Sequence, residues 1–93
     1  MEVYRLRIWL QTPQNIVLFD FTEEDGIEEE VESQLDTSII FKINDLAKFI
    51  IALKDNQQEC AKEGAVGAFR LERGQMVGDQ FIYDDLVELL TIP

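Results

Sequence analysis

The sequence predicts a single α+β domain over residues 1–93, with helices on one face of a mainly antiparallel sheet of four to five strands. Several short segments alternate apolar and polar residues, as half-buried strands do. One longer segment, residues 44–62, has the apolar spacing of an amphipathic helix. The chain is 93 residues long and 46% hydrophobic. That composition supports one packed core, so global disorder is not expected.

The first two strands are predicted at residues 3–12 and 16–21, joined by a proline-containing turn. In the first strand, apolar residues alternate with Arg5, Arg7 and Trp9, which therefore lie together on the opposite face. The second strand is apolar on both faces, which is typical of a strand inside a sheet. The short connection favours an antiparallel hairpin.

Residues 22–36 admit two interpretations. Thr22, with Asp25 three residues later, resembles a helix capping box, and apolar residues recur at every fourth position from Ile27. Gly26 and the run of neighbouring glutamates both weaken such a helix. We predict an acidic helix on the surface, and the pattern leaves open whether part of the segment is loop.

A third strand is predicted at residues 37–43, and the main helix at residues 44–62 follows it. Asn44 is the expected N-cap, because its side-chain oxygen can accept a bond from a free helix N–H. Gly64 is the expected stop. The apolar face of this helix begins with residues spaced i, i+3, i+4 and i+7, which are Leu46, Phe49, Ile50 and Leu53.

Two further strands and a last helix complete the prediction. The strands are expected at residues 65–72 and 75–83, with a turn at residues 73–74 and a bulge or kink near residues 78–79. A short helix is expected at residues 85–91, capped by Asp84. Its core-facing residues would be Leu86, Leu89 and Leu90. The predicted order is β-β-(acidic α)-β-α-β-β-α.

The net charge of −11 is unevenly distributed along the chain. Residues 20–36 contain nine acidic residues and no Lys or Arg, so the rest of the chain carries a net charge of only −2. Direct binding to nucleic acid or to an anionic membrane is not expected of such a protein. A basic protein surface is the expected partner. The candidate contact residues are Glu23, Glu24, Asp25, Glu28, Glu29, Glu30 and Glu32.

The residue types argue against catalysis and metal binding. The chain has no histidine and one cysteine, Cys60, which removes the usual general base, thiol–histidine pairs and soft-metal sites. Residues 20–26 resemble a calcium loop, but Asp25 stands where the loop needs glycine and Val31 where it needs glutamate. We therefore expect no enzyme activity, no cofactor and no metal site.

The sequence also bears on location. No apolar run approaches the roughly 20 residues that span a bilayer. The N-terminal segment alternates and lacks the apolar region of a signal peptide. We expect a cytoplasmic protein on these grounds.

Two functions fit these observations. The first is a non-enzymatic binding protein that inhibits or escorts a basic partner, with carboxylates standing in for nucleic-acid phosphates, as an inhibitor, anti-defence or immunity protein would. The second is a structural or assembly module that self-associates, for example as a homodimer, through Trp9 and the exposed sheet face or an edge strand. Trp9 is a candidate contact because Trp and Arg dominate binding hot spots. Steep salt dependence of binding would favour the first function.

Overall fold

The computed structural model describes residues 2–11, 21–34 and 38–93. These residues form one antiparallel sheet with the strand order β2-β3-β1-β4-β5, so that β2 and β5 are its edges. The elements are β1 (Glu2–Gln11), η1 (Glu23–Asp25), β2 (Ile27–Gln34), β3 (Ser38–Ile43), α1 (Leu46–Lys62), β4 (Val66–Val77) and β5 (Gln80–Ile92). The predicted α+β class with an antiparallel sheet is confirmed, whereas the predicted order of elements and number of helices are wrong.

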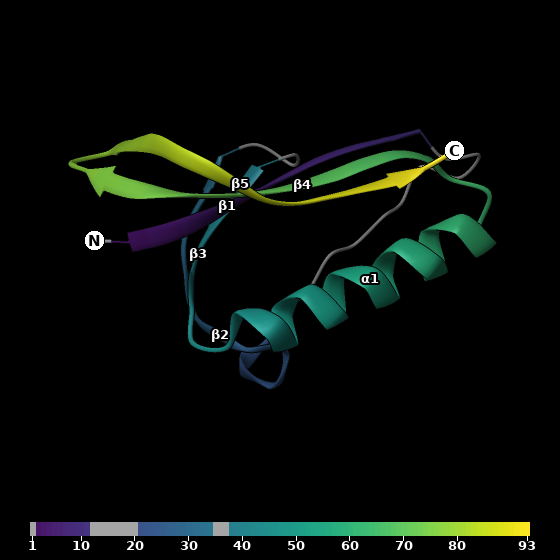
Figure 1. Ribbon diagram of the computed structural model, residues 1–93, viewed down its shortest axis with the longest axis horizontal. Helices are drawn as coiled ribbons and strands as arrows, with labels where there is room; N and C mark the ends of the chain where they lie inside the picture. The colour runs from purple at the N-terminus through teal and green to yellow at the C-terminus, as the bar shows by residue number, and fades with distance from the viewer. Residues whose placement is uncertain (1, 12–20, 35–37) are drawn as a thin grey trace.

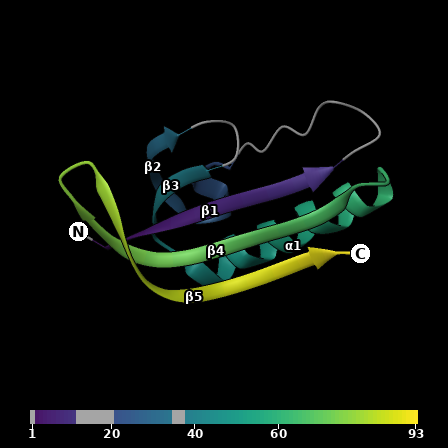
Figure 2. The ribbon, with the colours of Figure 1, turned by 90° about the horizontal axis from the view of Figure 1, so that it is seen from above.

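The molecule has two layers, the sheet and the helix α1 beneath it (Figure 1). Seen from above, α1 runs beneath β4 and β5 (Figure 2). The core fills the space between these layers, and no described helix lies over the other face. The largest fully buried core side chains are Phe41, Phe49, Phe69, Leu6, Leu53 and Leu71.

The central strand β1 divides its side chains between the face against α1 and the opposite face, where Val3 and Ile40 are also buried. Its even-numbered residues Tyr4, Leu6 and Ile8 are buried against the helix layer, while Trp9 is 45% exposed. β1 pairs with β3 on one side and with β4 on the other, so its alternation sets the two faces of its neighbours. The faces predicted for this strand are therefore confirmed.

The N-cap of the helix α1 lies one residue later in the chain than predicted. The N-cap is Asp45, whose Oδ1 accepts a hydrogen bond from the backbone N–H of Lys48 at 3.1 Å. Asn44 instead donates its backbone N–H to the carbonyl of Gly26 at 2.7 Å, which ties the residue to the preceding loop. The helix ends at Lys62, close to the predicted stop. Its buried side chains are Phe49, Leu53 and Cys60.

The acidic helix predicted at residues 22–36 is wrong. The capping box of Thr22 and Asp25 is present, but it starts only the single turn η1. Gly26 ends that turn with a φ of 88°, a left-handed conformation that suits glycine. The chain then enters β2, where pairing with β3 sets Ile27 opposite Ile43 and buries Ile27. Strand pairing and burial thus outweigh a marginal helical pattern.

The strand predicted at residues 16–21 and the turn before it lie outside the described residues, apart from Phe21. The ring of Phe21 packs against two core rings, with centroid distances of 6.0 Å to Phe41 and 5.0 Å to Phe49. Such offset and edge-on contacts between rings add to the burial of apolar area. Phe21 therefore belongs to the core although it lies outside the regular strands.

The C-terminal part also differs from the prediction. β4 continues through residues 73–74, where a turn was predicted, because Gly74 pairs with Val3 on one side and Tyr83 on the other. The chain reverses at residues 78–79 instead, with Val77 opposite Gln80. β5 then runs to Ile92, so the helix predicted at residues 85–91 is wrong.

Candidate functional site

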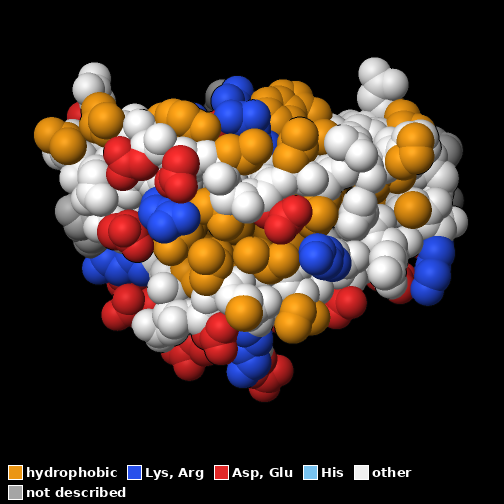
Figure 3. Space-filling model, in the orientation of Figure 1, with side chains coloured by type: hydrophobic (Ala, Val, Ile, Leu, Met, Phe, Trp, Pro, Cys, Tyr) orange, Lys and Arg blue, Asp and Glu red, His pale blue; other side chains and the backbone are white. Residues whose placement is uncertain are grey.

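Six of the predicted contact residues lie along one edge of the sheet, and we call this group the acidic edge. It consists of Glu23, Glu24 and Asp25 in η1 and Glu28, Glu29 and Glu30 in β2. All are exposed except Asp25, whose carboxylate accepts the backbone N–H of Thr22 at 2.9 Å. Glu32 is further along β2, opposite Ile40. Several acidic side chains lie along the lower border of the molecule in the view of Figure 3.

The acidic edge is mostly not neutralised by the protein itself. Glu29 pairs with Lys42 of the neighbouring strand, at 3.0 Å between Oε1 and Nζ. This hydrogen bond and the charge of Glu29 raise the pKa of Lys42. Within the described part of the chain, Glu23, Glu24, Glu28 and Glu30 form no salt bridge. Most of the negative field of the acidic edge is therefore available to a partner.

The acidic edge also has a purely structural use. β2 is an edge strand, and its pairing with β3 shifts register between Ile27 and Glu29 and again between Glu30 and Glu32. Charged side chains and bulges are two of the devices that stop edge strands from pairing with other chains. The glutamates of β2 thus protect an otherwise unpaired edge, whether or not they bind a partner.

Trp9 lies apart from the acidic edge, on the sheet face opposite α1, which we call the open face. Side chains of β1, β4 and β5 form cross-strand rows there: Trp9–Ala68–Thr91, Arg7–Arg70–Leu89 and Arg5–Glu72–Leu86. Trp9, Tyr83, Leu86 and Leu89 are each 42–47% exposed. The prediction that Trp9 lies beside Arg5 and Arg7 on the outer face is confirmed, and its role in binding stays a prediction.

An ion triad around one buried carboxylate lies in the middle of the open face. Glu72 is only 2% exposed, and its two carboxylate oxygens accept hydrogen bonds from Nε of Arg5 and Nε of Arg70, both at 2.8 Å. Sequence reasoning missed Glu72. Alternation does place Glu72 on the same face as Arg70, but its pairing with Arg5 depends on the register between two strands far apart in sequence.

Each arginine of the open face also stacks on an aromatic ring. The guanidinium carbon lies 4.7 Å from the ring centroid for Arg7 and Trp9, 4.5 Å for Arg5 and Phe81, and 5.9 Å for Arg70 and Tyr83. Cation–π contacts of this kind are worth about 0.5–1 kcal/mol at exposed sites. These contacts restrict the positions of the three guanidinium groups on the open face.

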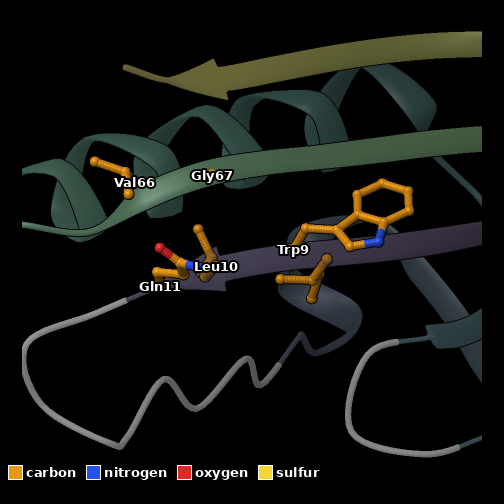
Figure 4. Close-up of a pocket in the computed structure, with 6 residues that line it drawn as sticks. Trp9, Leu10, Gln11, Val66 and Gly67 are labelled. Atoms are coloured by element: carbon orange, nitrogen blue, oxygen red, sulfur yellow. The ribbon is translucent and has the colours of Figure 1, made fainter.

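A cavity of about 490 Å³ lies next to Trp9, between the end of β1 and the start of β4. Its lining residues are Ile8, Trp9, Leu10, Gln11, Val66 and Gly67 (Figure 4). A Cβ atom at Gly67 would overlap the carbonyl oxygen of Trp9, so the close approach of the two strands requires glycine. The lining has no charged side chain and offers no group for acid–base chemistry.

The described residues offer little for other chemistry. No group of three or more Cys, Asp or Glu side chains among them is placed to hold a metal ion. Cys60 is buried, and burial, followed by the charges of Glu59 and Glu63, raises the pKa of its thiol. A raised pKa disfavours the reactive thiolate. None of the helices in residues 2–11, 21–34 and 38–93 has the length and apolar character needed to cross a membrane.

Comparisons with known proteins add no functional information. No family model, curated protein or solved structure matches the chain. The acidic edge and the open face are therefore the two surfaces from which a function can be inferred.

Proposed function

We propose that this protein is a non-catalytic binding protein that docks a basic protein surface on its acidic edge and thereby inhibits or escorts that partner. One observation supports the proposal. Glu23, Glu24, Glu28 and Glu30 are exposed along one edge and have no ion-pair partner among the described residues. Such a concentration of charge attracts an oppositely charged surface and raises its rate of association.

The strand geometry changes how the carboxylates would be displayed. In β2 the glutamates follow a strand with a rise of about 3.3 Å per residue rather than a helix. Successive side chains of a strand point to opposite faces, so Glu29 and Glu30 form a band of negative charge around the edge rather than a single row. A nucleic-acid-binding protein, whose site accepts phosphates, is one candidate class of basic partner. The carboxylates cannot be arranged along a helix, because residues 27–34 form the strand β2.

The test is capture of the partner from an extract of the native host, with variants that separate the acidic edge from overall charge. The edge variant carries Glu28→Lys and Glu30→Lys. It leaves Glu29 in place, because Glu29 pairs with Lys42. The control variant carries Asp55→Lys and Glu63→Lys, which make the same change in net charge at exposed positions of α1 and its C-cap.

We expect the wild type and the control variant to retain the partner and the edge variant to lose it. Binding should weaken steeply as NaCl rises from about 0.05 M to 0.5 M, because exposed charges are screened over about a Debye length. A partner that binds both variants equally, or binds regardless of salt, would show that the acidic edge is not the docking surface.

A further inference from the structure

Arg7 and Arg70 form a local positive cluster on the open face, and we propose that this part of the face is a second binding surface, for an acidic and apolar segment of a partner protein. A carboxylate of that segment lies between Arg7 and Arg70, and its apolar side chains rest on Trp9 and Leu89. This inference concerns a different surface from the acidic edge and goes beyond the function proposed above.

The charges of the open face do not cancel. Three arginines share one carboxylate, that of Glu72, and both of its oxygens are already occupied by Arg5 and Arg70. The cluster of Arg5, Arg7, Arg70 and Glu72 therefore has a local charge of +2, in a protein whose net charge is −11. Asp79 and Arg5 line one cavity between the β4–β5 hairpin and the strands β1 and β3. Arg7 is the arginine of this cluster that has no salt bridge among the described residues.

Arg7 and Arg70 are direct cross-strand neighbours on this face. Like charges directly opposite each other destabilise a strand pair, and an anion between them would relieve that repulsion. In the described part of the chain Arg7 forms no salt bridge, and Arg70 uses its Nε for Glu72. A guanidinium has five N–H donors, so both residues keep donors for a carboxylate, and guanidinium–carboxylate bonds are among the strongest polar contacts.

Apolar side chains flank the two arginines. Trp9 is next to Arg7 along β1, and Leu89 is opposite Arg70 on β5. Trp9 is 45% and Leu89 47% exposed, so both present apolar surface to solvent. Aromatic residues and arginine are enriched in the energetically dominant centres of interfaces, where water is excluded around them.

A protein segment fits this surface better than a second copy or a nucleic acid. Two copies stacked face to face across a two-fold axis would bring excess arginines together, and each copy carries a net charge of −11. A nucleic acid would bring many phosphates to a protein with a pI of about 4.2, the opposite of the usual footprint. A short segment with few carboxylates meets the local positive charge with little long-range repulsion.

Trp9 makes the proposal directly measurable, because it is the single tryptophan of the chain. The probe is a capped peptide of about eight alternating glutamate and leucine residues, the length of a strand. Titration is followed by the emission of Trp9 and by the anisotropy of a fluorescent label on the peptide. A peptide with glutamine in place of glutamate is the control for charge.

We expect the glutamate peptide to bind and to shift the emission of Trp9, and the glutamine peptide to bind more weakly. Arg7→Gln should weaken binding about tenfold, as for the loss of one charge-assisted hydrogen bond. Lys54→Gln makes the same charge change on the exposed side of α1 and should leave affinity unchanged. Unchanged circular dichroism and urea midpoint would show that Arg7→Gln keeps the fold.

Several results would overturn the proposal. One is a failure of the glutamate peptide to bind at concentrations up to about 1 mM, and another is binding without a change in the emission of Trp9. Equal affinity of Arg7→Gln and the wild type for the peptide would also contradict the proposal. Preferential binding of an oligothymidylate would assign the face to nucleic acid, and a dimer lost on Trp9→Ala would assign it to a second copy. The Glu28→Lys, Glu30→Lys variant should still bind the peptide, which separates this proposal from the acidic-edge function.

Discussion

At the scale of single residues, Glu72 is a carboxylate that has been removed from water on the sheet face opposite α1. Burying an unpaired charge is costly, so the fold keeps Glu72 ionised by giving each oxygen a guanidinium N–H donor. The side chains of Arg5 and Arg70 remain 26% and 30% exposed. Their own desolvation is therefore incomplete, which lowers the cost of burying the triad.

The pH dependence of stability tests this triad. Burial by itself raises the pKa of Glu72, but the hydrogen bonds from Arg70 and Arg5 outweigh it, so the pKa is lowered from its ordinary value. The triad therefore stabilises the fold fully above the pKa of an unfolded glutamate, about 4.3, and this contribution is lost as the pH falls through the lower folded-state pKa.

For Glu72→Gln we expect the free energy of unfolding in urea at pH 7 to fall by about 1–3 kcal/mol. The difference from the wild type should narrow in acid, below a pH of about 4. Urea titrations at several pH values give both quantities. A difference that stays constant down to the lowest pH would mean that the charge of Glu72 does not carry the effect.

At the scale of elements, a β-bulge in β5 gives the sequence the apolar spacing of a helix. Leu86 and Leu89 are three residues apart, as on one helix face. The pairing of β5 with β4 shifts register where Leu71 faces Glu88 and Glu72 faces Leu86. The extra residue, at position 87, brings both leucines onto the open face of a strand. The three-residue spacing of these leucines, which suggested a helix, is therefore explained by a bulged strand.

Alanine substitutions distinguish the observed strand β5 from the helix predicted at residues 85–91. In β5, Leu90 is 8% exposed and Leu89 47%. We expect Leu90→Ala to lower the free energy of unfolding by about 2–4 kcal/mol, as for a buried leucine. Leu89→Ala should change it by less than about 0.5 kcal/mol. Similar losses for both variants in urea unfolding would support the helix that the sequence predicted, in which both leucines docked on the core.

At the scale of the whole molecule, charge is segregated between surfaces. The acidic edge lies at one border of the sheet, and the arginines lie in the middle of its open face. The helix layer covers the opposite face (Figure 1). Because the two proposed docking surfaces do not overlap, the partners proposed for them would not compete for one site.

Net charge should also govern overall stability. With a net charge of −11 the folded chain repels itself, and salt screens that repulsion. We expect the urea midpoint to rise when NaCl increases from about 0.01 M to 0.1 M, as the Debye length falls from about 30 Å to 10 Å.

The acidic edge should account for much of this effect. A Glu28→Gln, Glu30→Gln variant should gain less from salt than Asp55→Asn, Glu63→Gln, because its remaining charges are less crowded. Equal responses of the two variants would place the repulsion in the molecule as a whole rather than at the acidic edge.

The sequence by itself determined the features that depend on local periodicity and composition. These are the α+β class, the two faces of β1 with Trp9 beside Arg7, the main helix α1 and the concentration of negative charge. Periods of 2.0 and 3.6 residues decide which side chains share a face, whatever else the chain does. For this reason the position of Trp9 could be predicted and the charged segment could be located.

Only the tertiary structure decided which segments became edge strands and which charged side chains formed ion pairs. Residues 27–34 and 85–91 have patterns that suit a marginal helix, and they became strands because a neighbouring strand supplied backbone hydrogen bonds and burial. Arg5 and Glu72 are 67 positions apart, and only the register between β1 and β4 brings them together. Register is a property of pairs of strands, so no local pattern in either strand reveals it.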